Sequence, residues 1–206
     1  MRITPDIVTP AIITPAIVTP AIVTPDILTT GTRAHVLLPS PIGHLTLVAE
    51  AGQVIGLYMD SQRHRPVSQT FGAEGDPADE PFASAAWQLA AYFAGDLTTF
   101  DLPLAPAGTP FQQRVWSALQ SIPYGQTWSY AQLARQVGSA SRAVGLANGK
   151  NRIALIIPCH RVIGSDGSLT GYGGGLDRKR YLLELEASAR TRAAALTERT
   201  ASSSRP

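Results

Sequence analysis

Residues 129–150 read SYAQLARQVGSASRAVGLANGK. Ser129 is a favourable N-cap for a helix that runs to Val137, and Gly138 can end that helix in the left-handed conformation. A second helix, which contains Arg142, follows almost at once. Two short helices joined by so tight a turn predict a helix-turn-helix.

The residues on either side of this motif extend it into a domain. Upstream, Thr109 and Pro110 are typical of an N-cap and a first helical position, and apolar residues follow at helical spacing. Downstream, residues 154–157 predict a buried strand, residues 162–170 a hairpin and residues 176–186 a closing helix. A helix-turn-helix followed by a hairpin resembles a winged helix.

The first half of the chain has a different pattern. Apolar residues alternate through 34–38 and 45–57, with a turn at Gly52, which predicts three antiparallel strands. Residues 82–95 carry apolar side chains at helical spacing, and residues 61–80 are predicted to form a loop. The expected fold class is therefore mixed α/β, of the α+β type, with a small N-terminal antiparallel-sheet α/β domain and a C-terminal winged-helix-like domain.

The sequence divides into four segments. A five-residue repeat fills residues 3–30, and its regular prolines remove backbone donors and prevent a continuous helix. The Ala, Ser and Arg-rich C-terminus is also expected to be disordered. The predicted segments are a disordered Thr-Pro repeat tail at 1–32, an N-terminal α/β domain at 33–106, a C-terminal winged-helix domain at 107–187 and a disordered tail at 188–206.

Charge is distributed unevenly between the two predicted domains. Residues 33–106 hold three Arg against eight acidic residues, whereas residues 107–187 hold nine Lys or Arg against four acidic residues. The two domains therefore carry −5 and +5, although the whole chain carries only +2. A basic domain favours a polyanionic partner such as nucleic acid, because phosphates release counterions on binding; an ordinary solvated surface is the alternative.

Composition narrows the classes of protein and of site. No apolar run reaches the roughly 18 residues of a membrane span, and the N-terminus lacks a signal-peptide layout, so a cytoplasmic protein is expected. The single cysteine, Cys159, excludes an internal disulfide and a multi-cysteine zinc site. That cysteine is either a structural thiol or a reactive one.

Cys159 directly follows the predicted buried strand, where the chain leaves the core. The neighbouring imidazole of His160 could accept the thiol proton, directly or through water, and so activate a nucleophile. A small, buried structural cysteine is the alternative, because adjacent side chains often point apart.

The residues around Cys159 decide between these alternatives. The segment IPCHRVI at 157–163 resembles the active-site signature of the O6-alkylguanine-DNA alkyltransferases. The resemblance covers residues 34–187. The other matching motifs are SPIG at 40–43, FQQRVW at 111–116, IPYG at 122–125, Ser129-Tyr130, RAVG at 142–145, ANGKN at 147–151 and GYGGG at 171–175.

This resemblance implies DNA repair by direct damage reversal. Cys159 would take an alkyl group, such as methyl, from O6-alkylguanine in one irreversible turnover, with O4-alkylthymine as a further substrate to test. His160 would polarise the thiol through a water, and Glu186 would orient the imidazole. Asn151 would hold the recognition helix against the active-site strand. No metal, nucleotide or redox cofactor is implied.

The same resemblance implies a set of DNA contacts. Tyr172 would lie against the extruded base, and the backbone amide of Gly173 would lie near its O6 atom. The recognition helix would enter the minor groove, with Arg142 filling the space left by the base and Tyr130 helping to turn its phosphate. The implied partner is double-stranded DNA containing O6-alkylguanine, bound by a monomer.

Some residues depart from the family pattern. The turn at 138–142 is shorter than the family's, Trp128 adds bulk beside the phosphate-turning tyrosine, and Arg152 replaces a common proline. Asn148 and Gly149, at the end of the recognition helix, could change the preferred size of the lesion.

Three other functions are open on the sequence. A non-enzymatic alkyltransferase-like binder would require a replaced cysteine. A winged-helix transcription regulator would bind a specific sequence, usually as a dimer. A Cys-His hydrolase would turn over an ester or an amide. None of the three accounts for the spacing between Cys159 and the glycine-rich loop.

Overall fold

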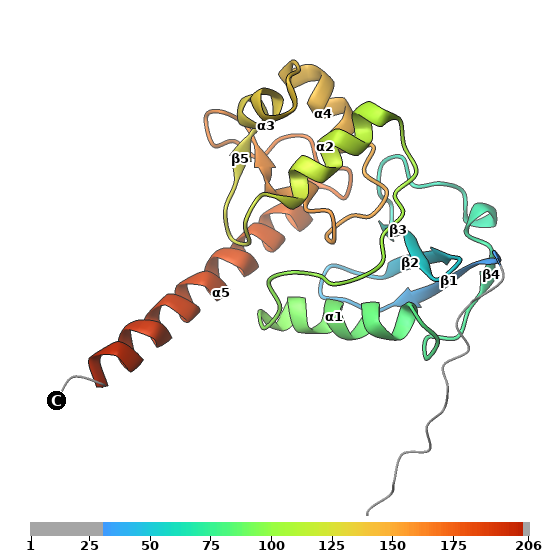
Figure 1. The fold of residues 1–206 in the computed structure, drawn as a ribbon, viewed down its shortest axis with the longest axis horizontal. Helices are drawn as coiled ribbons and strands as arrows, with labels where there is room; N and C mark the ends of the chain where they lie inside the picture. Colours follow the sequence, from blue (N-terminus) through green and yellow to red (C-terminus); the bar gives the residue numbers. More distant parts are fainter. Residues whose placement is uncertain (1–30, 204–206) are drawn as a thin grey trace, which may run out of the picture.

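We describe the fold from a computed structural model, which covers residues 31–203 and, for side chains, residues as far as Arg192. A sheet carrying helix α1 lies on one side of the molecule, and three short helices, α2 to α4, lie on the other (Figure 1). The predicted repeat tail at 1–32 falls almost wholly outside the described residues. No helix within 31–203 has both the length and the hydropathy needed to cross a membrane.

The N-terminal domain is a four-stranded sheet in the order β3-β2-β1-β4, with a helix packed on it. The three long strands pair antiparallel, as expected, but β4 pairs in parallel with β1. The predicted loop at 61–80 therefore contains an edge strand, which at two residues is too short to show a period. The elements are β1 (Arg33–Leu38), β2 (Leu45–Glu50), β3 (Gln53–Met59), a 3-10 helix (Ser68–Phe71), β4 (Ala73–Glu74) and α1 (Phe82–Ala94).

The C-terminal domain contains the predicted helix-turn-helix. The side chains of Thr109 and Ser129 cap α2 and α3 through capping boxes, and Gly138 ends α3 at φ 65°, where only glycine is unstrained. The elements are α2 (Pro110–Gln120), β5 (Trp128–Ser129), α3 (Tyr130–Val137), α4 (Ser141–Gly149), a 3-10 helix, η2 (Cys159–Arg161), β6 (Val162–Ile163) and α5 (Leu176–Ser203).

Two predicted β elements of this domain are wrong. Residues 154–157 form turns instead of a strand, and Leu155 has φ 67°. These residues are apolar because they are buried in the core, so their hydrophobicity indicated burial and not strand pairing. The turn of the predicted hairpin is present, and the amide of Gly164 closes it by donating to the carbonyl of Ser168. The hairpin pairing is absent from residues 162–170, because β6 pairs in parallel with β5 and not with the chain that follows the turn.

The closing helix is longer than predicted. α5 runs to Ser203 and extends away from the molecule (Figure 1), whereas the sequence prediction ended it at Glu186 and placed a disordered tail from 188. Residues 176–203 contain no Gly or Pro, and their Ala, Leu, Glu and Arg residues favour a helix. The first added turn also packs, because Ala189 is buried.

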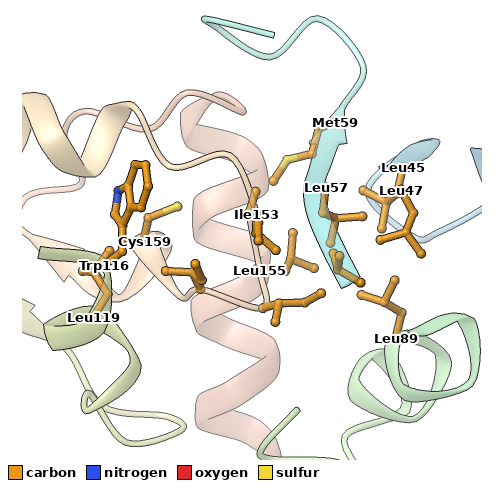
Figure 2. Packing of buried hydrophobic residues seen from close by; sticks show 14 of the residues in the cluster. Leu45, Leu47, Leu57, Met59, Leu89, Trp116, Leu119, Ile153, Leu155 and Cys159 are labelled. Atoms are coloured by element: carbon orange, nitrogen blue, oxygen red, sulfur yellow. The ribbon is translucent and has the colours of Figure 1, made fainter. Parts of the chain in front are cut away.

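The free edge of β3 binds the end of the N-terminal domain at one position and the C-terminal domain at another. The amide of Val54 donates to the carbonyl of Pro103 (2.8 Å), and the amide of Leu57 donates to that of Arg152 (2.8 Å). One hydrophobic core then runs from Leu57 on the sheet to Cys159 (Figure 2). The only cysteine therefore lies in a core that both domains build.

Candidate active site

Cys159 begins the 3-10 helix η2 and is almost fully buried, beside the indole of Trp116 (Figure 2). A cavity of about 10 Å³ adjoins it, which has room for one water at most. Burial raises the pKa of the thiol, while a hydrogen bond from Asn151 and the charge of Lys179 lower it. The thiol is therefore shielded from solvent and depends on neighbouring groups to ionise.

The next residue, His160, is fully buried and paired with a carboxylate. Its Nε2 lies 2.8 Å from Oε1 of Glu186, which is also fully buried. Burial lowers the pKa of His160, against the opposing influence of Glu186. Burial alone would raise the pKa of Glu186, but hydrogen bonds and charges from His160 and Arg161 outweigh it and lower this pKa to about 2.

These pKa directions fix the tautomer of the imidazole. A carboxylate accepts hydrogen bonds only, so the neutral ring of His160 must carry its proton on Nε2 and donate it to Glu186. The lone pair is then on Nδ1, which is buried and has no hydrogen-bond partner within the described residues. That nitrogen is free to accept a proton.

Glu186 also accepts hydrogen bonds from three other residues, which the sequence analysis did not identify as its donors. The hydroxyl of Tyr92 donates to Oε1 (2.7 Å), and the amide of Gly125 donates to Oε2 (2.9 Å). The guanidinium of Arg161 donates through Nε to Oε2 (3.0 Å) and through Nη2 to Oε1 (3.1 Å). A carboxylate with so many donors is fixed in place and stays ionised.

Two asparagines tie the end of helix α4 to the segment before the cysteine. Nδ2 of Asn151 donates to the carbonyl of Ile157 (2.8 Å), and its Oδ1 accepts from the amide of Ile153 (3.0 Å). Nδ2 of Asn148 lies 3.4 Å from the carbonyl of Cys159. Asn151 therefore lies between the end of α4 and the segment before Cys159.

Lys179 is a second buried charge that the sequence analysis missed. Its Nζ donates to the carbonyls of Val162 and Thr170, and so connects β6 to the start of the glycine-rich loop. Burial lowers its pKa to about 8, and the nearby Cys159 acts in the opposite direction. Lys179 and Glu186 lie seven residues apart on the buried face of α5.

The glycine-rich loop covers the cavity at Cys159. Tyr172, Gly173 and Gly174 line it together with Met59 from the other domain. A Cβ on Gly174 would lie 2.5 Å from Sδ of Met59, so a larger residue there would displace the Met59 side chain. The carbonyl of Gly173 accepts from the amide of Arg63 (2.8 Å), whereas the amide of Gly173 has no acceptor within the described residues.

The helix-turn-helix presents the remaining predicted residues at the surface. Tyr130 lies against Gly145 of α4, and its hydroxyl donates to the carbonyl of Gly171 (3.3 Å). Arg142 is exposed on α4, three residues before Gly145 and so on a neighbouring part of the same face. The short turn therefore leaves Arg142 and Tyr130 on adjacent helices.

An open cleft of about 560 Å³ runs between α4 and the glycine-rich loop. Leu146, Gly149 and Lys150 line it from α4, and Tyr172 and Gly173 line it from the loop. Tyr172 and Gly173 also line the small cavity at Cys159. The glycine-rich loop therefore forms part of the wall between the cleft and the cavity at the thiol.

Two family models match consecutive parts of the chain. The 6-O-methylguanine DNA methyltransferase ribonuclease-like domain matches residues 35–106, and the 6-O-methylguanine DNA methyltransferase DNA binding domain matches residues 110–188.

Named relatives agree with these matches. The methylated-DNA–protein-cysteine methyltransferase of Mycobacterium tuberculosis (strain ATCC 25618 / H37Rv) is 56% identical over 153 residues, which are 73% of this chain and 90% of the relative. The protein of the same name from Methanosarcina acetivorans is 48% identical over 157 residues, 75% of this chain and 98% of the relative. A solved structure of Mycobacterium tuberculosis OGT in complex with DNA superposes with a TM-score of 0.71 at 53% identity, covering 76% of this chain and 94% of that one.

Proposed function

Because the chain belongs to the 6-O-methylguanine DNA methyltransferase family, it is a DNA-repair protein that transfers an alkyl group from DNA to a cysteine, and we propose that Cys159 is the acceptor. The proposed substrate is O6-alkylguanine in double-stranded DNA. The observation that carries the proposal is the buried pair of His160 and Glu186 directly beside the only cysteine of the chain.

His160 acts as the base in this proposal. Its Nδ1 receives the thiol proton of Cys159, directly or through a water, and Glu186 stabilises the imidazolium that forms. The thiolate then attacks the saturated carbon on O6. The sulfur–carbon bond forms while the carbon–O6 bond breaks, and the electron pair of that bond remains on the guanine. The thioether product is stable to hydrolysis, so each protein molecule reacts once.

The guanine leaves as an anion that needs hydrogen-bond donors. The amide of Gly173, which has no acceptor in the described chain, is positioned on the cavity wall to supply one. Tyr172 stacks on the base in this proposal; burial raises its pKa well above the usual range, so its hydroxyl stays protonated. The cavity at Cys159 is far smaller than a nucleobase, so residues that line it must move before a base can enter.

DNA binds along α4 in this proposal. Arg142 enters the space that the extruded nucleotide leaves, and Tyr130 contacts its phosphate, without reading the sequence around the lesion. One protein molecule acts on one lesion, so a monomer is sufficient. The expected cytoplasmic location stays a prediction.

Single-turnover kinetics on three duplexes test the proposed substrate. The duplexes carry O6-methylguanine, O4-methylthymine or unmodified guanine at the same position, and the restored base is measured by chromatography. We expect fast repair of O6-methylguanine that stops at one lesion per protein. Repair that continues beyond one equivalent, or that occurs only on O4-methylthymine, would contradict the proposal.

A further inference from the structure

Tyr92 reaches the reaction centre from the other domain. It belongs to α1, which packs on the N-terminal sheet, yet its hydroxyl donates to Oε1 of Glu186 at 2.7 Å. The side chain is fully buried, and burial raises its pKa well above the usual range for tyrosine, so it remains an O–H donor. No other side chain of the N-terminal domain donates to Glu186 within the described residues.

Tyr92 and His160 compete for one oxygen atom. Nε2 of His160 lies 2.8 Å from Oε1 of Glu186, and the Tyr92 hydroxyl lies 3.5 Å from that same nitrogen. A donor that shares an acceptor withdraws negative charge from it, and this electrostatic effect is larger in a buried site of low dielectric than in water. The hydroxyl therefore reduces the charge that Glu186 offers to an imidazolium.

We infer that Tyr92 is a positioning residue through which the N-terminal domain sets the basicity of His160. This inference rests on the proposed function, in which His160 accepts the proton of Cys159. Tyr92 holds the Glu186 carboxylate in place, and its hydrogen bond reduces how strongly this carboxylate stabilises a protonated imidazole. His160 then stays neutral, with Nδ1 free, until the thiol gives up its proton.

The other groups around His160 do not replace this effect. Arg161 also donates to Glu186, and Lys179 adds a second positive charge, so both already oppose protonation of the imidazole. Neither donates a hydrogen bond from outside the C-terminal domain. Tyr92 alone makes the network depend on how the two domains pack.

Removing the hydroxyl tests the inference. In Tyr92→Phe, the rate of methyl transfer on the acid limb of the rate–pH profile should fall about tenfold, because loss of one hydrogen bond to the charged Glu186 lets the imidazole take up a proton at a higher pH. The pKa of His160 should rise, so the acid limb of the rate–pH profile should move upward by about one pH unit. Thermal unfolding establishes that the variant is folded, and NMR titration of the labelled imidazole reports the pKa independently of the rate.

Tyr124→Phe is the matched control. The ring of Tyr124 lies edge-on to Tyr92 with centroids 5.9 Å apart, but its buried hydroxyl has no hydrogen-bond partner within the described residues. This variant also removes a phenolic hydroxyl from the same aromatic cluster, but it leaves the hydrogen bonds of Glu186 in place. The rate and the pH profile should match those of the unmodified protein.

A double-mutant cycle separates action through Glu186 from a general effect on packing. In the Glu186→Gln background the charge is gone, so Tyr92→Phe should change the rate less than twofold, roughly the error of such cycles. Equal losses in both backgrounds, or an unchanged pKa of His160 in Tyr92→Phe, would overturn the inference. A complete lack of transfer by the unmodified protein would instead overturn the proposed function.

Discussion

The network around Glu186 and the surface of α4 that we propose binds DNA are built in opposite ways. Glu186 and His160 are fully buried, and the carboxylate accepts from four different residues. Arg142 and Lys150 on α4 are exposed. The groups proposed for proton transfer are therefore in position before DNA arrives, whereas the groups proposed for DNA binding would acquire their partners only in the complex. Changes in the first region should affect chemistry and stability together, and changes in the second should affect binding alone.

The largest expected effect is at the acceptor. Cys159→Ala should abolish transfer completely, because no second thiol exists in the chain. Binding to a duplex with O6-methylguanine should persist, since the α4 surface is unchanged. Fluorescence anisotropy and a repair assay on the same duplex measure the two properties. Residual transfer by this variant would contradict the proposed acceptor.

Glu186→Ala should be the next most severe change. It leaves Arg161 buried without its ion-pair partner, which costs about 3 to 5 kcal/mol of unfolding free energy. Transfer should also slow by about 100-fold or more, because the imidazole loses the group that fixes its tautomer. Urea unfolding and single-turnover kinetics give the two values. A variant that loses stability but keeps full activity would show that Glu186 stabilises the fold without assisting methyl transfer.

Acid should destabilise the protein through the same buried pair. The pKa of Glu186 is lowered from 4.5 to about 2, so its stabilising contribution is complete above pH 4.5 and is lost as pH falls toward 2. The pKa of His160 is lowered from 6.5, so the unfolded chain takes up this proton first and stability already declines below that pH. The total loss should reach a few kcal/mol.

Unfolding free energies measured from pH 7 to pH 3 check this expectation, with Glu186→Gln as the comparison. The variant should show a flatter dependence below pH 4.5, because the amide does not titrate. An equal slope in both proteins would assign the acid sensitivity to other carboxylates.

Arg142→Ala should weaken binding to the lesion without changing stability. The side chain is exposed and makes no hydrogen bond within the described residues, so the melting temperature should stay the same. The apparent affinity for a lesion duplex should fall about tenfold, because the extruded base then loses the group that replaces it in the stack. Equal affinity of both proteins would remove Arg142 from the DNA contacts.

The smallest effect is expected at Lys150, on the rim of the open cleft. Lys150→Ala should reduce DNA affinity slightly and lower the slope of log affinity against log salt by about 1, as for one lost phosphate contact. Binding titrations at several salt concentrations measure the slope. An unchanged slope would place the DNA path away from this end of α4.

Local signals in the sequence predicted most of the helices, whereas most of the candidate site residues came from the family resemblance. Thr109, Ser129 and Gly138 mark helix ends through caps that act within a few residues, and the structure confirms all three. The proximity of Glu186 to His160 came from the family resemblance, and no local pattern would have indicated it. The family assignment of the whole chain is confirmed by the comparisons.

Most of the features that the sequence did not predict depend on long-range packing. Tyr92 and Arg161 join the network from distant parts of the chain, 94 and 25 residues from Glu186. Lys179 is buried although lysine usually lies at a surface, because backbone carbonyls satisfy its charge. The segment 154–157 is apolar in the manner of a strand, but it fills the core as a series of turns.

The intact mass of the protein after reaction with a duplex that carries one O6-methylguanine tests the central claim most directly. Peptide mapping locates the modification, and Cys159→Ala serves as the control. We predict that each molecule gains the mass of a single methyl in place of hydrogen, that the methyl lies on Cys159, and that the control gains none. An unchanged mass at full occupancy of the lesion, or a methyl on any other residue, would contradict the assignment of Cys159 as the acceptor.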